Sequence, residues 1–396
     1  MVYPKPLSGV KVVEFTHMVM GPAAGLMLGD LGAEVVKVEP IGGDKTRRLK
    51  GAGAGYFAMY NRNKKSIAVD LKSRSGSEIA HRLIDEADVF IENFRPGALD
   101  KLGFGYDALS QTNPGLIYCS EKGFLPGPYD HRTALDEVAQ MMGGLAYMTG
   151  PPGRPLRAGS SVIDVTGGMF GALAVLAALR ERDASGRGAH VSASLFETTA
   201  FFVGQHMAQY AVTGTPAAPM PARVSAWAIY DVFDAQDGEK VFVGVVSDGQ
   251  WRAFCDAFDL TDWAQDETLA ANNNRVARRE EIIPRIKAIF SEMSKDALMA
   301  RLEETGLPFA PITKPEDMMT DPHLAASGGL LEVKIPGGGE TVLPNLPVSF
   351  DGERPALRLN PPEIGAHTEE VLSSLDYSAQ TISQFISEGV VQSSAS

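Results

Sequence analysis

The stretch that decides the fold is residues 7–39, which read LSGVKVVEFTHMVMGPAAGLMLGDLGAEVVKVE. Two short apolar runs, 10–15 and 34–39, flank a segment rich in Gly and Ala at 22–31. Short apolar runs bounded by turn residues are typical of buried strands, and the segment between them has the length of a helix. A strand, a helix and a second strand in this order predict a parallel α/β sheet.

The same alternation continues along the first half of the chain. Further strand patterns lie at 66–70, 89–92, 116–119 and 190–194, and helical patterns at 78–87, 135–147 and 166–182. Because strands that alternate with helices form parallel sheets, we expect these segments to belong to one α/β domain.

The pattern changes after a segment rich in Pro, Ala and Gly at 213–221. The next strand and helix patterns lie at 228–233, 240–246, 249–258 and 275–305. Asp237-Gly238 separates the two strand patterns and is typical of a tight hairpin. We therefore expect a smaller α+β domain over 225–320. Pro336-Gly-Gly-Gly indicates another hairpin further along the chain.

The composition excludes several classes of protein. Among 396 residues, 36 Lys and Arg stand against 49 Asp and Glu, and the net charge of −13 argues against a nucleic-acid binder. The longest apolar stretch, 169–179, is shorter than the about 20 residues of a bilayer span, so we expect a buried helix there. No apolar signal core follows Met1, and Cys119 and Cys255 cannot form a disulfide framework. We therefore expect a cytoplasmic protein without membrane partners.

The charge is distributed unevenly. Residues 37–74 contain ten basic and three acidic side chains, a local charge of +7, so that the rest of the chain carries −20. A basic island on an acidic protein can attract a small anion such as the phosphates of a nucleotide-like ligand. An unevenly charged, solvated surface is the alternative interpretation.

Common cofactor motifs do not fit this chain. Gly21 and Gly25 in the first strand–helix turn lack the G-x-G-x-x-G spacing of dinucleotide-binding folds. The chain has no P-loop, no G-x-S-x-G nucleophile elbow and no His or Cys pair at metal-ligand spacing, so we expect no metal site. His17 lies in the first turn, where sheets of this type place ligands, and a ligand contact or a structural histidine fits equally.

Asp164 stands out because apolar residues surround it and a helical pattern begins just after it. Gly167, Gly168 and Gly171 would allow backbone or a ligand to come close on this helix. An ordinary helix cap is one interpretation, since Asp accepts backbone N–H bonds at helix N-termini. The other is a carboxylate held in a mostly apolar pocket, where it can act as a nucleophile.

Taken together, ordered motifs along nearly the whole chain resemble the class III CoA-transferase family, whose members include formyl-CoA, carnitine and dicarboxylate CoA-transferases. Beside residues 7–39, the motifs are NRNKKSIAVDLK at 61–72, ADVFIENFRPGALDKLG at 87–103, DEVAQ at 136–140, DVTGGM at 164–169, GRG at 186–188 and GAHTEEVL at 365–372.

The resemblance implies an architecture. Residues 1–200 and 330–396 would form a large Rossmann-like domain that binds CoA, and 225–320 a small α+β domain. Residues 201–224 and 321–329 would link them. Two such chains would interlock as a homodimer with active sites at the interface. The family uses acyl-CoA and carboxylic acids as substrates and needs no permanently bound cofactor or metal.

The resemblance also implies a mechanism in which Asp164 is the catalytic residue. Its carboxylate would attack the donor thioester and give a mixed anhydride and CoA thiolate. The thiolate would then attack the aspartyl carbonyl to give an aspartyl-CoA thioester, which an incoming carboxylate would resolve by the same steps in reverse. Covalent catalysis of this kind divides one difficult exchange into easier ones.

Matched positions imply further roles. The CoA-binding positions are His17, Val19, Met20, Leu71, Lys72, Asn93, Phe94, Arg95 and Lys101. Tyr56 matches an aromatic position near the acyl group. Pro40 stands where some relatives carry a CoA-contacting Arg, and Arg47 or Arg48 would compensate for that contact.

Succinyl-CoA is the donor we expect, with a four- or five-carbon acid as acceptor. Two alternatives remain. An α-methylacyl-CoA racemase shares the family's fold but needs a His base at the position of Thr133, and His131 lies two residues away. A non-catalytic CoA-binding protein would bind CoA without acylation of Asp164.

Overall fold

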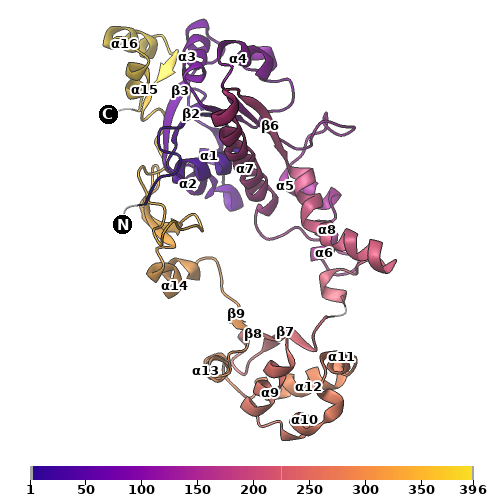
Figure 1. Ribbon diagram of the computed structural model, residues 1–396. Coiled ribbons are helices and arrows are strands. Elements are labelled where there is room, and N and C mark those ends of the chain that lie inside the picture. Colours follow the sequence, from indigo (N-terminus) through magenta and orange to yellow (C-terminus); the bar gives the residue numbers. More distant parts are fainter. Residues whose placement is uncertain (1–2, 224, 395–396) are drawn as a thin grey trace. The chain divides into compact units, whose positions relative to one another are not determined.

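The computed structural model describes residues 3–223 and 225–394, and the chain divides into two compact units (Figure 1). Met1–Pro221 and Pro322–Ser396 form the first unit, and Ala222–Asp321 form the second.

The segments expected as linkers are partly helical. Helix α8 (Leu195–Thr213) runs through the first half of 201–224, because no proline interrupts it before Gly214 ends it with a φ of 67°. The second expected linker, 321–329, contains the short helix α14 (Pro322–Ala326). The connection ahead of the second unit is therefore shorter than the sequence pattern indicates.

A seven-stranded sheet forms the centre of the first unit. Its strands are β1 (Lys11–Phe15), β2 (Glu34–Glu39), β3 (Lys64–Val69), β4 (Val89–Glu92), β5 (Ile117–Lys122), β6 (Ala189–Ser194) and β12 (Val391–Gln392). They lie in the order β12-β3-β2-β1-β4-β5-β6, and all are parallel except β12, which is antiparallel to β3. The predicted α/β class and the six parallel strands are confirmed, with small differences at the strand ends.

The strand order reverses between β1 and β4, which lie side by side although β2 and β3 separate them in sequence. Phe15 pairs with Glu92 at the ends of these strands, so the turns that follow leave the sheet at the same level. In open α/β sheets, ligands bind outside the carboxyl ends of the strands at such a reversal. The turns that begin at Thr16 and Asn93 are therefore where a site is expected.

Helices cover both faces of this sheet (Figure 1). One face packs against α1 (Met20–Asp30) and α7 (Val162–Ser185), with a core that includes Leu28, Ile91 and Val175. The other face packs against α3 (Arg74–Asp85), α4 (Tyr106–Thr112), α15 (Thr368–Ser374) and α16 (Ala379–Ser387). Helices from both ends of the chain thus share one core.

Glycines let α7 lie directly on α1. A methyl group at Gly168 would be 2.6 Å from the Met20 carbonyl oxygen and 3.1 Å from Ala23 Cβ. Of the described helices, α7 alone is long and apolar enough to cross a bilayer. One side of it packs on α1 and β5, whereas Met169 and Leu173 are exposed, so the helix expected to be buried over 169–179 is buried on one side only.

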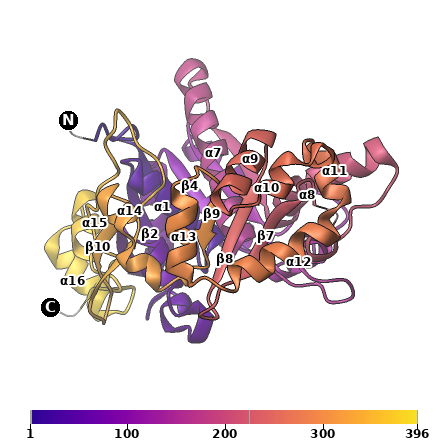
Figure 2. The ribbon, with the colours of Figure 1, turned by 90° about the horizontal axis from the view of Figure 1, so that it is seen from below.

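The second unit has its own core. Its antiparallel strands are β7 (Ile229–Asp234), β8 (Lys240–Val245) and β9 (Phe309–Pro311), and its helices include α9 (Asp248–Ala257), α11 (Asn272–Ala277), α12 (Arg279–Phe290) and α13 (Lys295–Glu303) (Figure 2). The Asp237-Gly238 hairpin is confirmed, and Gly238 has a φ of 78°. The helix predicted at 275–305 is divided into three, because Arg278 leaves helical geometry and Ser294 caps a new helix by accepting a bond from Ala297 N.

The end of the chain returns to the first unit. The predicted hairpin at Pro336-Gly-Gly-Gly joins β10 (Leu330–Lys334) to β11 (Glu340–Pro344). Further on, Ser66 N donates to His367 Nδ1 at 3.2 Å, and Gly365 N donates to Ser66 Oγ at 3.0 Å. These bonds attach the C-terminal segment to β3.

The contact between α1 and α7 can be tested with Gly168→Ala. The added methyl group would overlap the Met20 carbonyl, so we expect the free energy of unfolding to fall by about 1–3 kcal/mol, measured by urea denaturation. Gly204→Ala on α8 is the matched control, because a Cβ there meets nothing within 4 Å. The control should be neutral or stabilising by up to about 1 kcal/mol. Equal effects of the two changes would contradict the proposed close contact.

Candidate active site

A cavity of about 330 Å³ opens at the carboxyl ends of β1 and β4. Its lining residues are His17, Met18, Met20, Tyr56, Asn93, Glu121, Lys122, Gly123, Ala134, Leu135, Asp136, Glu137, Ser161, Asp164 and Leu195. A second cavity of about 440 Å³ shares His17, Asn93 and Glu121 with it and extends past Phe94 and Arg95. The two cavities are therefore neighbours at the strand-order reversal.

Asp164 is the third residue of α7 and does not cap this helix. The cap position is Ser161, whose side chain makes no capping bond. Instead, Oδ2 of Asp136 accepts bonds from the backbone N–H groups of Ile163, at 2.9 Å, and Asp164, at 3.1 Å. The helix-cap interpretation of Asp164 is therefore wrong, because a second aspartate caps the helix and leaves the Asp164 carboxylate available.

The capping aspartate is itself held in place. Gln140 Nε2 donates to Asp136 Oδ1 at 2.5 Å, and Gln140 Oε1 accepts from Ala158 N at 2.8 Å. Asp136 and Gln140 are both buried on α5 (Asp136–Met142). Two buried side chains from one helix thus fix the first turn of another.

The surroundings of Asp164 raise its pKa to about 7. Burial is the largest cause, since it disfavours the charged form, and the negative charge of Asp136 adds to it, while Arg157 acts in the opposite direction. Near neutral pH a substantial fraction of Asp164 is therefore ionised, and the carboxylate is less solvated than an exposed aspartate. Its carboxylate accepts no hydrogen bond from the residues that the structure describes.

The turns after β1 and β4 are joined to each other. His17 N donates to Asn93 Oδ1 at 3.0 Å, and Asn93 Nδ2 donates to the His17 carbonyl at 2.8 Å. The His17 ring lies 5.4 Å from the Phe94 ring, centroid to centroid. Partial removal of water from His17 lowers its pKa, so the ring is neutral at pH 7. His17 therefore contributes ring surface and hydrogen bonding to the cavity, without charge.

Tyr56 also lines the first cavity. The Tyr56 hydroxyl, on α2 (Tyr56–Tyr60), is 3.3 Å from Ser161 Oγ at the start of α7. Burial and the Asp164 charge raise the pKa of nearby Tyr60 to about 12, so this phenol stays neutral. The expected aromatic residue thus lies beside the start of α7.

Two side chains at the end of β5 were not predicted from the sequence. Lys122 Nζ contacts Glu92 at 2.5 and 2.7 Å and donates to the Phe94 carbonyl at 2.8 Å. Glu121 is 2% exposed and lines both cavities. The strand pattern at 116–119 ends before these charged residues, so neither was predicted as a site residue.

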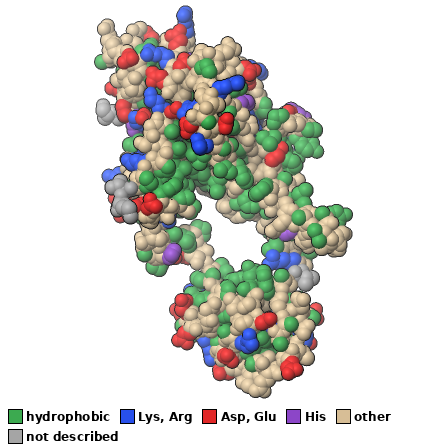
Figure 3. All heavy atoms as spheres, in the orientation of Figure 1, with side chains coloured by type: hydrophobic (Ala, Val, Ile, Leu, Met, Phe, Trp, Pro, Cys, Tyr) green, Lys and Arg blue, Asp and Glu red, His purple; other side chains and the backbone are tan. Residues whose placement is uncertain are grey.

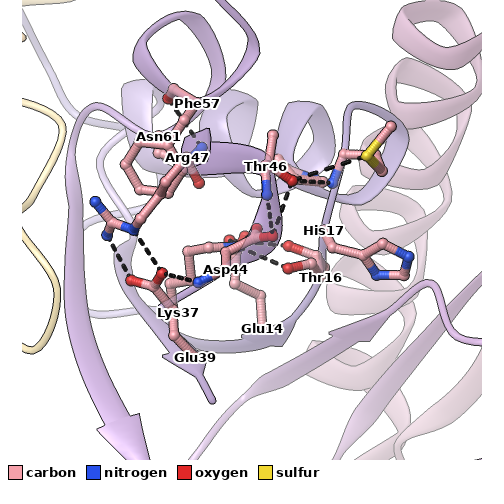
Figure 4. Close-up of polar contacts among 12 residues, drawn as sticks. Glu14, Thr16, His17, Lys37, Glu39, Asp44, Thr46, Arg47, Phe57 and Asn61 are labelled. Atoms are coloured by element: carbon pink, nitrogen blue, oxygen red, sulfur yellow. Dashed lines mark hydrogen bonds and ion pairs between the residues drawn. The ribbon is translucent and has the colours of Figure 1, made fainter. Parts of the chain in front are cut away.

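Several basic side chains of residues 37–74 point into the protein and pair with acidic groups. Figure 4 shows two of them, Lys37 and Arg47. Lys37 Nζ donates to the Thr16 carbonyl at 2.6 Å and lies 3.3 Å from Asp44 Oδ2. Lys64 Nζ contacts both oxygens of Glu14, at 2.9 and 3.0 Å, and the Pro22 carbonyl at 2.8 Å. These bonds attach the turn between β1 and α1 to the neighbouring strands β2 and β3.

Two arginines of the island are engaged as well. Arg62 pairs with Asp30 at 2.6 Å and is 1% exposed. Arg47 pairs with Glu39 at 2.6 Å, and its guanidinium stacks 3.6 Å from the Phe57 ring centroid. These four side chains compensate buried carboxylates, whereas Lys45, Arg48, Lys50, Lys72 and Arg74 are exposed, so the basic surface over 37–74 is smaller than the sequence indicates. Arg47 lines neither cavity, and we leave it out of the proposed binding site.

The remaining predicted residues lie around the cavities. Met20 lines the first one, whereas Val19 is buried at the start of α1. Leu71 and Lys72 follow β3 at the same edge of the sheet, and Lys101 lies beyond the loop after β4; these three line neither cavity. Among the described residues, no group of three or more His, Cys, Asp or Glu could hold a metal ion.

The site predicts that Asp136→Asn lowers the pKa of Asp164. The amide oxygen can still accept the bonds from Ile163 and Asp164 N–H, while the negative charge that raises the pKa is removed. We expect a decrease of about one pH unit, measured by NMR titration of protein labelled with ¹³C-aspartate. An unchanged or higher pKa would show that Asp136 acts on Asp164 only through the backbone.

Comparison with known proteins gives a consistent result. A model of CoA-transferase family III matches residues 7–368. The succinate–glutarate CoA-transferase of Agrobacterium fabrum is 34% identical over 94% of this chain and 96% of that protein. The succinyl-CoA:glutarate CoA-transferase of Mus musculus is 32% identical over 98% of this chain and 91% of that protein. A CAIB/BAIF family protein from Brucella suis, of known crystal structure, is 33% identical with a TM-score of 0.83, over 94% of this chain and 99% of that one.

Proposed function

The chain belongs to CoA-transferase family III, and we propose that it moves CoA from succinyl-CoA to a second dicarboxylic acid through covalent intermediates on Asp164. The observation that carries the mechanism is the free carboxylate of Asp164 in a cavity at the sheet's strand-order reversal. The relatives that act on succinate and glutarate support a dicarboxylic acid as substrate.

The reaction begins when the Asp164 carboxylate attacks the thioester carbonyl of the donor. The carbon–sulfur bond breaks, CoA leaves as a thiolate, and the acyl group and Asp164 form a mixed anhydride. The thiolate attacks the aspartyl carbonyl, which releases the donor acid and leaves an aspartyl-CoA thioester. The acceptor carboxylate attacks that thioester, and the released thiolate takes the new acyl group from the resulting anhydride. Asp164 is a carboxylate again at the end.

The residues around Asp164 suit this chemistry. The Asp136 bonds to the first turn of α7 fix the position of the nucleophile, and positioned nucleophiles react faster than free ones. Ile163 is fully buried and packs with Met20 and Leu195, which limits the water that could hydrolyse an anhydride. Because burial leaves the Asp164 carboxylate poorly solvated, its ionised fraction is an effective nucleophile.

CoA extends from Asp164 along the second cavity in this proposal. Asn93 and Phe94 face the part nearest the thioester, and Arg95 lies further out, where its exposed guanidinium suits a phosphate. Lys72, which follows β3, and Lys101, beyond the loop after β4, are further phosphate contacts in this proposal. Leu71 and Val19 support the turns in which they lie. His17 and Met20 line the wall beside the thioester.

The racemase alternative lacks its base. Thr133 occupies the matched position, and His131 is 75% exposed and lies near Asp130. A general base must come within hydrogen-bond distance of the proton that it removes. His131 lines neither of the two cavities, so the residues present favour CoA transfer over proton abstraction.

We also propose that two chains form the interlocked homodimer implied by the resemblance, in the cytoplasm. Apolar side chains are exposed along α7 and α8, among them Leu173 at 60%, Phe201 at 74% and Val212 at 85% (Figure 3). An exposed apolar surface of this kind is typical of a protein–protein interface. Cys119 and Cys255 are free and buried, as suits a reducing compartment.

Trapping of the covalent intermediate tests the mechanism. Incubation with succinyl-CoA followed by hydroxylamine should convert Asp164 to a hydroxamate, identified by mass spectrometry of its peptide. Asp164→Ala should fold normally and transfer CoA at least about 10³-fold more slowly. Transfer of CoA between acids with Asp164 never acylated would contradict the mechanism. Exchange of the substrate's α-proton with deuterated water, without transfer, would support the racemase.

The dimer is tested by light scattering after gel filtration. The unmodified chain should have about twice the monomer mass of 42.3 kDa. Leu173→Glu combined with Val212→Glu places two charges on the apolar surface and should reduce the dimer fraction. Ile386→Glu, an exposed apolar residue on α16, is the matched control and should leave the mass unchanged. A monomeric unmodified protein would refute the dimer.

A further inference from the structure

Glu121 is a buried carboxyl group without a partner. It is 2% exposed, and neither of its oxygens has a hydrogen-bond partner among the described residues. A buried polar group without a partner is costly to keep, so such groups occur where they meet a ligand or a water molecule. Glu121 lines both cavities of the candidate site, but its two oxygens are fully buried, so a substrate supplies the missing partner once the side chain turns toward the cavity.

The position of Glu121 relative to Asp164 follows from α7. Its Oε1 lies so close to Gly171 that any side chain there would overlap it. Gly171 is seven residues, or about two turns, beyond Asp164, so the two positions lie on one side of the helix and about 10 Å apart along its axis. An acid with a carboxylate at each end can bridge this interval, given carbon–carbon bonds of about 1.5 Å and hydrogen bonds of about 2.7 Å.

The other carboxyl groups around the first cavity favour an uncharged Glu121. Its described lining includes the carboxyls of Glu121, Asp136, Glu137 and Asp164. The one lysine in this lining, Lys122, is already paired with Glu92, and Glu137 is paired with Arg157. A dianionic substrate would therefore meet repulsion if Glu121, Asp136 and Asp164 were all ionised.

Burial raises the pKa of Glu121 to about 8. The charges that face it are Glu14 on β1, Glu92 on β4 and Asp164 on α7, which raise the pKa further, and Lys64 on β3, which lowers it. Cys119 lies next to it on the same strand, and its thiol is neutral because burial raises its pKa well above the usual value. Glu121 is thus mostly a neutral carboxylic acid at pH 7.

We propose that Glu121 is a specificity-determining residue: its protonated carboxyl donates a hydrogen bond to the second, non-reacting carboxylate of a dicarboxylic acid whose first carboxylate reacts at Asp164. An O–H donor to a carboxylate forms a short, charge-assisted bond. A monocarboxylic acid has no group to accept it and leaves Glu121 without a partner. The inference rests on the proposed function and adds the basis of its preference for diacids.

The test compares Glu121→Leu with Glu121→Gln. Glutarate and its matched monoacid, pentanoate, serve as acceptors with saturating succinyl-CoA. At pH 7, Glu121→Leu should raise KM for glutarate about 10–100-fold, with KM for pentanoate changed less than about threefold. Glu121→Gln keeps a neutral donor and should stay within about fivefold of the unmodified enzyme.

The pH profile gives a second readout. With the unmodified enzyme, KM for glutarate should rise above about pH 8 as Glu121 ionises, and this rise should be absent in Glu121→Gln. Both variants should fold, and Glu121→Leu should raise the Tm, because it removes a buried polar group without a partner.

Three results would overturn the inference. They are an unchanged KM for glutarate in Glu121→Leu, an equal rise for glutarate and pentanoate, and an alkaline rise that persists in Glu121→Gln. In each case transfer by the unmodified enzyme would leave the proposed function intact. Failure of the unmodified enzyme to transfer CoA to any acid would overturn both.

Discussion

The direct contact of α7 with α1 is the constraint on which the site depends. Gly168 lies against the backbone of α1, and Gly171 lies against the Glu121 carboxyl. Side chains at these positions would push α7 away from the sheet, because packed cores tolerate added volume poorly. Since Asp164 stands at the start of the same helix, the packing of the α7 glycines sets how far the Asp164 carboxylate lies from the turns after β1 and β4.

Buried ion pairs stabilise the strands next to those turns. Glu14, Lys37 and Lys64 are fully buried on three neighbouring strands, where each charge has an opposite partner or a carbonyl. Removing one member of such a set is strongly destabilising, because the others would remain charged and unpaired. The turn that carries His17 is therefore fixed by an internal ionic network, and the charges of that network are not available to a ligand.

The sequence was sufficient to predict the parallel sheet and to place Asp164 at the start of a helix. The parallel strands follow from short apolar runs such as 34–39, whose pattern is local, and the motif around Asp164 is a continuous stretch. Contacts between residues that lie far apart in the sequence could not be predicted from such local patterns. The bond from Asp164 N to Asp136 joins residues that lie 28 positions apart in the sequence. The contact of Lys37 with Thr16 depends on how β2 pairs with β1 in the sheet. A count of basic residues over 37–74 treats internal ion pairs as surface charge, which is why it overestimates the basic surface.

Two carboxyl groups in one cavity differ in character because their surroundings differ. Asp164 stands at the positive end of a helix, and its raised pKa still allows an ionised fraction near neutral pH. Glu121 lies two turns deeper, among other acids and without a hydrogen-bond donor from the described residues, so the neutral form prevails. A carboxyl group must be ionised to act as a nucleophile, whereas a group that receives an anion must not repel it. The same side-chain chemistry can therefore serve both ends of a dicarboxylic acid, provided that the fold keeps one carboxyl near the helix terminus and the other against the sheet.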